Sequence, residues 1–204
     1  VDRFGKGEPV IRFLSEDMGI KLSESAVKKL LDTEFPYYEY DLLGVLKSDM
    51  IGKVYVDATD ECPPVKEAVR FSQEHGIALT YPYLGDIGES VTGDKRAQKC
   101  EDEYLDQLFE VITDLGIKGV SYMPSRNTHE QLRRLRGLCA KYNMLEISGE
   151  DINQPRQKFV CMKQREPEFA NLYDAAWALI GHELLATENL DDAIFSPKMI
   201  ERMP

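Results

Sequence analysis

The sequence predicts an α/β fold built from parallel β/α units. Between residues 53 and 149, short apolar runs alternate with amphipathic helical patterns. The apolar runs are rich in β-branched and aromatic residues, which favour strands. Each helical pattern ends at a glycine or an asparagine, the residues that most readily adopt a left-handed conformation. A helix, a stop and a strand repeat three times in succession, and this repetition favours a parallel sheet.

The predicted strands share a length of three to six residues and lie between helical patterns. They span residues 54–56, 77–81, 117–122 and 144–148. The predicted helix ends are Gly76, Gly116 and Asn143. Thr128, followed three residues later by Gln131, predicts a capping box at the start of the third helix.

Two further regions flank the predicted β/α portion, which spans residues 52–165. Residues 1–51 read as a helical subdomain, with Ser23 as an N-cap. Residues 166–204 form a helical tail, in which a helix is expected over 168–185. Its expected buried stripe consists of Leu172, Ala175, Ala176, Leu179 and Ile180.

Composition excludes several classes of protein. The 204-residue chain carries a formal net charge of -11, so it offers no basic surface for nucleic acid or an anionic membrane. The four cysteines have no metal-ligand spacing, and the chain has neither a signal peptide nor a long apolar run. We therefore expect a cytoplasmic protein with reduced thiols. Because the chain begins at Val1, we expect it to be a piece of a larger protein.

Polar residues follow each predicted strand, and the carboxyl ends of parallel strands usually face a ligand. These residues are Asp57, Tyr81 and Asp86, Ser125 with Arg126, and the segment 149–153. Loops of any parallel sheet also carry such residues for solvation, so only their convergence indicates a site.

Several motifs resemble a known family. The segments Tyr81-Pro82, Gly116-Ile117-Lys118-Gly119-Val120-Ser121-Tyr122-Met123-Pro124-Ser125 and Gly149-Glu150-Asp151-Ile152-Asn153 occur in the order found in the second half of the PHP (polymerase and histidinol phosphatase) family. The resemblance runs from about Gly52 to Asn153. It implies that the β/α units form part of a distorted TIM-like barrel. It also implies divalent metals (Mn, Mg or Zn) in the intact protein and hydrolysis of a small phosphorylated substrate.

The chain departs from the family pattern at its metal motifs. The family's His-x-His motif is absent, Tyr81 stands where the family commonly has histidine, and Asn153 replaces the histidine of Asp-x-His. The resemblance leaves Asp151 and Asn153 as candidate metal ligands through oxygen. None of the three histidines has ligand spacing to another.

Four residues are candidates for contact with the substrate. Arg126 and Arg156 follow predicted strands, and a guanidinium pairs with phosphate through two hydrogen bonds. Tyr81 and Asp86 end the second predicted strand and its loop. Pairing of either arginine with a surface carboxylate is the alternative.

The sequence therefore supports two functional hypotheses. In the first, the chain is the C-terminal portion of a PHP-type metal-dependent phosphoesterase, inactive when isolated. In the second, it is a catalytically degenerate barrel that binds a small anionic ligand or a protein partner. Four strands cannot close a barrel, so uncovered sheet edges also allow a homo-oligomer.

Overall fold

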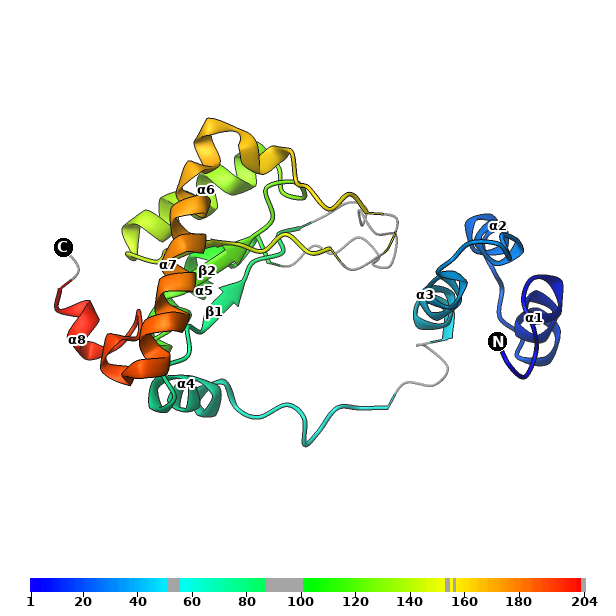
Figure 1. Ribbon diagram of the computed structural model, residues 1–204, viewed down its shortest axis with the longest axis horizontal. Helices are drawn as coiled ribbons and strands as arrows, with labels where there is room; N and C mark the ends of the chain where they lie inside the picture. The colour runs from blue at the N-terminus through cyan, green and yellow to red at the C-terminus, as the bar shows by residue number, and fades with distance from the viewer. Residues whose placement is uncertain (51–55, 87–100, 153–154, 156, 203–204) are drawn as a thin grey trace. The chain divides into compact units, whose positions relative to one another are not determined.

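The computed structural model describes residues 1–50, 56–86, 101–152, 155 and 157–202. Within this part of the chain, the fold is α/β, with eight α-helices and a three-stranded parallel sheet (Figure 1). The chain divides into two compact units. One includes Val1–Thr59, and the other includes all three strands and the helices from α4 to α8.

The N-terminal unit is helical, as the sequence predicts. It contains α1 (Glu8–Arg12), a π-helical turn (Phe13–Asp17), α2 (Glu24–Leu31) and α3 (Tyr38–Met50). Ser23 caps α2 by accepting a hydrogen bond from the backbone N–H of Ala26 at 3.1 Å. The fully buried Tyr38 accepts a hydrogen bond from the Gly7 N–H at 2.9 Å, which ties the start of α3 to the start of α1.

The sheet contains three of the four predicted strands. Strands β1 (Thr80–Pro82), β2 (Gly119–Tyr122) and β3 (Leu145–Ser148) lie side by side in that order, and both pairs are parallel. The sheet is open and does not close into a barrel within the described residues. The strand predicted at residues 54–56 lies mostly outside the described residues, which include only Val56 of the three. Val56 is 86% exposed and lies in irregular backbone.

The three β/α units end their helices in the same way. Helices α4 (Val65–Glu74), α5 (Leu105–Leu115) and α6 (His129–Lys141) are each followed by a residue with positive φ. These residues are Gly76 (65°), Gly116 (88°) and Asn143 (51°), as predicted. The next apolar residue then donates its N–H to a carbonyl five positions back, with distances of 2.8 Å from Ile77, 2.9 Å from Ile117 and 2.9 Å from Met144. Because this N–H is bonded to the preceding helix, the first apolar residue does not pair with a neighbouring strand. All three strands therefore begin later than the apolar runs predict.

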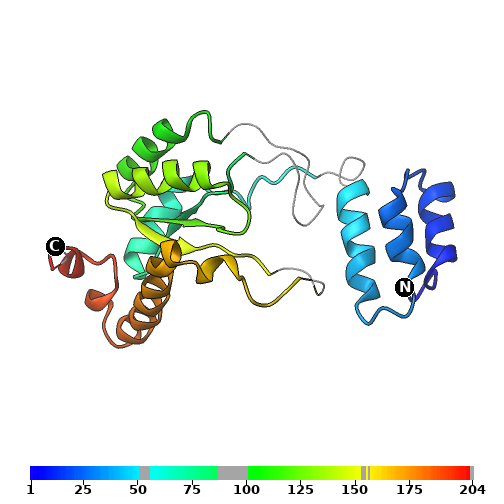
Figure 2. The same ribbon diagram turned by 90° about the horizontal axis from the view of Figure 1, so that it is seen from above.

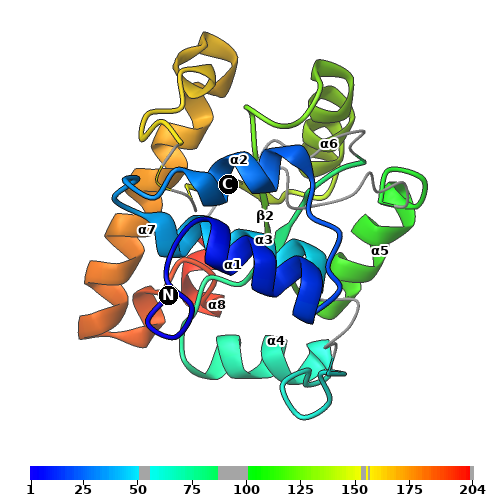
Figure 3. The ribbon, with the colours of Figure 1, turned by 90° about the vertical axis from the view of Figure 1, so that its right-hand side faces the viewer.

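The main core lies between the sheet and the two helices on one of its sides. Val120 and Tyr122 of β2 pack with Phe109 of α5 and Leu135 of α6, and all four are fully buried. The capping box predicted at Thr128 and Gln131 is present at the start of α6. Figures 2 and 3 show α5 and α6 on one side of the sheet and α7 (Ala170–Glu188) on the other.

Helix α7 packs against β3 but buries less of its surface than the sequence predicts. Leu172 and Ala175 are buried, whereas the predicted core residues Ala176 and Ile180 are exposed and Leu179 is half-buried. The reason is that α7 is apolar on several sides and only one side meets the sheet. Short 3₁₀ turns (Lys163–Arg165, Pro167–Phe169, Leu190–Asp192) and α8 (Pro197–Ile200) complete the unit. Among the described residues, no helix has the length and apolar character needed to cross a membrane.

Candidate functional site

Three polar segments meet at the carboxyl edge of the sheet because its strands are parallel. Asp86, Arg126 and Asp151 follow β1, β2 and β3 respectively. Hydrogen bonds extend the sheet into these segments: Tyr83 donates its N–H to Ser121 at 2.8 Å, and Gly149 donates to Tyr122 at 2.7 Å. The predicted fourth member, Asp57, is exposed and belongs to the N-terminal unit.

Glu101 binds the end of β1 and the loop that follows it. One carboxylate oxygen accepts from the Tyr81 hydroxyl at 2.7 Å, and the other accepts from the backbone N–H groups of Gly85 at 2.7 Å and Leu84 at 3.2 Å. The Tyr81 side chain therefore serves as a hydrogen-bond donor that holds this loop.

Asp86 and Asp102 bind each other's backbone. Asp86 Oδ1 accepts from the N–H groups of Glu101 at 2.8 Å and Asp102 at 3.3 Å, while Asp102 Oδ2 accepts from the Asp86 N–H at 3.2 Å. Gln131 of α6 joins them by donating to the Asp86 carbonyl and to Asp102 Oδ2, both at 2.7 Å. At least one oxygen of Asp86 is thus used to shape the loop.

The loop after β1 is closely packed. Gly85 has a φ of +70°, and a Cβ atom there would lie 2.7 Å from Asn127 Nδ2 and 2.9 Å from the Tyr83 hydroxyl. Only glycine fits both the backbone conformation and the space. The loop is therefore fixed against the segment that follows β2.

Two phenols at this edge remain protonated. Burial and the hydrogen bond to Glu101 raise the pKa of Tyr81 above its ordinary value of 10.0. Burial and the hydrogen bond to Asp102 raise the pKa of Tyr83 in the same way. Neither oxygen is a phenolate near neutral pH, so neither provides an anionic metal ligand.

Arg126 and Asn127 carry buried polar atoms whose hydrogen-bonding capacity is not used within the described part of the chain. Arg126 Nε and Nη2 are buried and have no hydrogen-bond partner among the described residues, and the same holds for Asn127 Oδ1. Asn127 itself is 7% exposed, and its Nδ2 donates to the Leu84 carbonyl at 2.8 Å. Buried donors without an acceptor are rare in folded proteins, which marks this guanidinium as a candidate for binding an anion.

The segment bearing Arg126 is anchored to the end of β3. Glu150 accepts from the Ser125 N–H at 2.7 Å and from the Ser125 hydroxyl at 2.6 Å. The next residue, Arg126, donates its own N–H to the Met123 carbonyl at 3.0 Å. These three bonds fix the backbone from which the guanidinium extends.

The remaining candidates are not brought together in the described structure. Asp151 is exposed, and the predicted ligand Asn153 and the predicted phosphate contact Arg156 lie outside the described residues. In the described part of the chain, no group of three or more His, Cys, Asp or Glu side chains is arranged to hold a metal. Asp151 is therefore the one described residue of the predicted ligand pair.

The histidines lie in other surroundings. His75 Nδ1 is 3.0 Å from the Phe71 carbonyl, His129 Nδ1 is 3.6 Å from a Glu168 oxygen, and His182 Nδ1 accepts from the Ile194 N–H at 3.1 Å. Each ring thus has a partner within the protein.

Sequence reasoning missed four residues that shape this edge: Glu101, Asp102, Asn127 and Glu150. Glu150 appears in the sequence only as part of the motif at residues 149–153. Glu101 and Asp102 lie far along the chain from the strand they bind, so no local pattern indicates them. The available signal was the tyrosines themselves, because a buried tyrosine hydroxyl needs a hydrogen-bond acceptor.

Comparison with protein-family models, with curated proteins and with solved structures gives no match for this chain. A functional assignment therefore depends on the residues at the carboxyl edge of the sheet.

Proposed function

We propose that the carboxyl edge of the sheet is the phosphate-binding wall of a PHP-type metal-dependent phosphoesterase. The observation that carries this proposal is the Arg126 guanidinium, whose Nε and Nη2 are buried without a partner in the part of the chain that the structure describes. Leaving buried donors unsatisfied costs about 1–3 kcal/mol each, more for a charged group. A bound anion removes that cost.

The geometry of a guanidinium favours phosphate as that anion. Nε and Nη2 point along one edge of the planar group and can donate two parallel hydrogen bonds to two oxygens of one phosphate. The anchored Ser125 backbone and the packed loop at Gly85 hold this segment in place without a ligand. Such preorganisation reduces the entropic cost of binding.

The metal chemistry of the proposal requires ligands beyond those described. Asp151 is a suitable oxygen donor for a hard cation, but Asp86 holds backbone N–H groups and Tyr81 stays protonated. When bound, divalent metal in such an enzyme polarises a phosphoryl oxygen and activates water. The residues of this chain bind and orient the phosphate.

The direct test is a calorimetric titration of the full chain with inorganic phosphate. Arg126→Gln keeps a polar side chain but removes the positive charge and the pair of parallel N–H donors. We expect this change to weaken phosphate binding by about ten- to a hundredfold. Arg133→Gln removes an exposed arginine from α6 and should leave phosphate binding unchanged. Equal affinity of wild type and Arg126→Gln would refute the proposal.

A second candidate is a catalytically degenerate domain that binds a small anion or a protein partner without hydrolysis. Tyr81 favours it, because a phenol held as a donor by Glu101 occupies the position of a family metal ligand. Metal analysis of the intact protein separates the two. Stoichiometric manganese or zinc in the intact protein supports the phosphoesterase, and an intact protein without bound metal supports the degenerate domain. Phosphate binding by the 204-residue chain is expected in both cases.

A further inference from the structure

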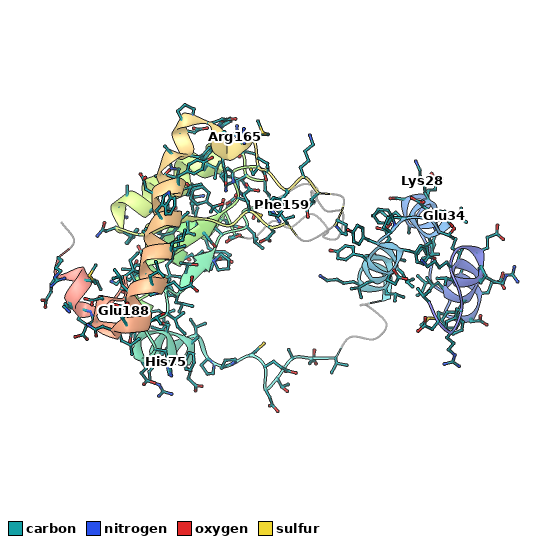
Figure 4. The ribbon with its side chains drawn as sticks, viewed as in Figure 1. Lys28, Glu34, His75, Phe159, Arg165 and Glu188 are labelled. Carbon is teal, nitrogen blue, oxygen red and sulfur yellow. The ribbon has the colours of Figure 1, made fainter. Side chains whose placement is uncertain are left out.

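Helix α7 presents two apolar faces, and among the described residues only one of them is covered. Leu172 and Ala175 are buried. Going around the helix, the opposite face carries large apolar side chains that remain in water. Figure 4 shows α7 with its side chains, from a point near Arg165 at its N-terminal end to Glu188 at its C-terminal end.

The exposed face forms a continuous stripe, here called the outer stripe. It consists of Tyr173, Trp177, Ile180 and Leu184, which are 49%, 71%, 47% and 68% exposed. Their spacing of four, three and four residues places them on one side of the helix. The stripe is roughly 16 Å long at 1.5 Å per residue. Aligned apolar residues of this kind are typical of an interaction surface, unlike scattered single ones.

The carboxylates of α7 are its charged side chains, and they lie on both sides of the outer stripe. Helix α7 contains Asp174, Glu183 and Glu188 and has no lysine or arginine, in a chain of net charge -11. Glu183 borders the stripe on one side, and Asp174 and Glu188 border it on the other. An apolar centre with an acidic rim complements an apolar surface with a basic rim.

A second copy of the chain is a poor fit to this face. In an antiparallel pair of α7 helices centred between Trp177 and Ile180, Asp174 of one copy faces Glu183 of the other. A parallel pair places each acidic residue beside its own counterpart. Like charges at these positions oppose association.

We propose that the outer stripe of α7 binds a basic amphipathic helix of a partner protein. The partner's apolar residues, at helical spacing, pack on Trp177 and Leu184, and its lysine or arginine side chains pair with Asp174 and Glu183. This surface lies on the opposite side of the sheet from α5 and α6 (Figures 2 and 3) and is independent of the proposed phosphate contact.

Trp177 provides the readout, because it is the single tryptophan of the chain. The probe is a helical peptide of leucine and lysine without tryptophan, and its control is the same peptide with each lysine replaced by glutamate. Titration of the full chain with the lysine peptide should shift Trp177 emission to the blue in a saturable way that added salt weakens. The glutamate peptide should cause no shift.

Matched variants locate the binding surface. Leu184→Ser and Ile180→Ser should each weaken binding of the lysine peptide by roughly tenfold or more, since each truncates a central apolar contact. Leu185→Ser alters an equally accessible leucine about 100° around the helix and should leave binding unchanged. Circular dichroism of the variants should match wild type.

Several results overturn the proposal. These are the absence of a saturable emission shift, equal shifts with both peptides, and equal affinity of Leu184→Ser and wild type. A blue shift that grows with protein concentration alone, together with a doubled mass in sedimentation, assigns the stripe to a second copy. A blue shift with zwitterionic lipid vesicles and none with the peptide assigns it to a lipid surface.

Discussion

At the scale of single residues, a tyrosine hydroxyl bonded to a carboxylate is a recurring feature of this chain. Three half-buried or buried tyrosines each donate a hydrogen bond to a carboxylate: Tyr81 to Glu101 at 2.7 Å, Tyr83 to Asp102 at 2.5 Å and Tyr122 to Glu146 at 2.7 Å. Each pair joins segments that are distant in the sequence. Burial is the largest cause of the raised pKa of all three phenols, followed by the hydrogen bond to the carboxylate.

These raised pKa values predict that the chain loses stability in alkali. The unfolded phenols lose their protons near the ordinary pKa of 10.0, while the folded phenols keep theirs. The unfolded state then binds fewer protons, so the free energy of unfolding falls as pH rises above about 10 and is unaffected by these groups below it. Urea unfolding between pH 8 and 11 should show this decline. Tyr122→Phe should make it shallower, whereas Phe at the exposed Tyr37 should leave it unchanged.

Sequence reasoning placed Arg126 correctly after a strand because the helix, stop and strand pattern fixes where β2 ends. It did not reveal that the guanidinium lacks a partner, because that depends on which side chains surround it. It also did not reveal the hydrogen bonds of Tyr81 with Glu101 and of Asp86 with Asp102, which are 20 and 16 positions away in the sequence. Pairings over such distances leave no periodic signal.

At the scale of elements, the stops after α4, α5 and α6 determine how each helix leads into the next segment. A left-handed residue and a hydrogen bond spanning five positions close all three helices. Sequence alone predicted these stops because glycine and asparagine have a strong local reason to be there. It predicted where the strands begin less well, because the apolar run continues through the residue that closes each helix, so that β1, β2 and β3 begin only at Thr80, Gly119 and Leu145.

Substitutions at two of these stops should have opposite effects. Gly116→Ala places a side chain at a φ of 88° and should lower the free energy of unfolding by about 1–2 kcal/mol. The nearest atom to the new Cβ is 3.4 Å away, so the loss comes from backbone conformation and not from a collision. Asn143→Gly, at a φ of 51°, should leave stability equal or higher. Chemical denaturation of both variants provides the measurement, and a stable Gly116→Ala would contradict the assignment.

At the scale of the whole molecule, the chain combines a helical unit with an open three-stranded α/β unit (Figure 1). The fold class was predictable, because periodicity distinguishes helices from strands and a helix between successive strands favours parallel order. The partial barrel remains a proposal, since three strands leave the closure of the sheet undetermined. The exposure of α7 was not predictable, because an apolar helix has the same sequence pattern whether one or two of its faces are covered.

The measurement that most directly tests the central claim is calorimetric titration of the full chain with inorganic phosphate in metal-free buffer. If Arg126 supplies the binding wall, phosphate should bind saturably without metal. Added manganese should bind weakly and produce no turnover of an aryl phosphate. Phosphate binding that appears only after micromolar manganese has bound, together with metal-dependent turnover, would contradict the account.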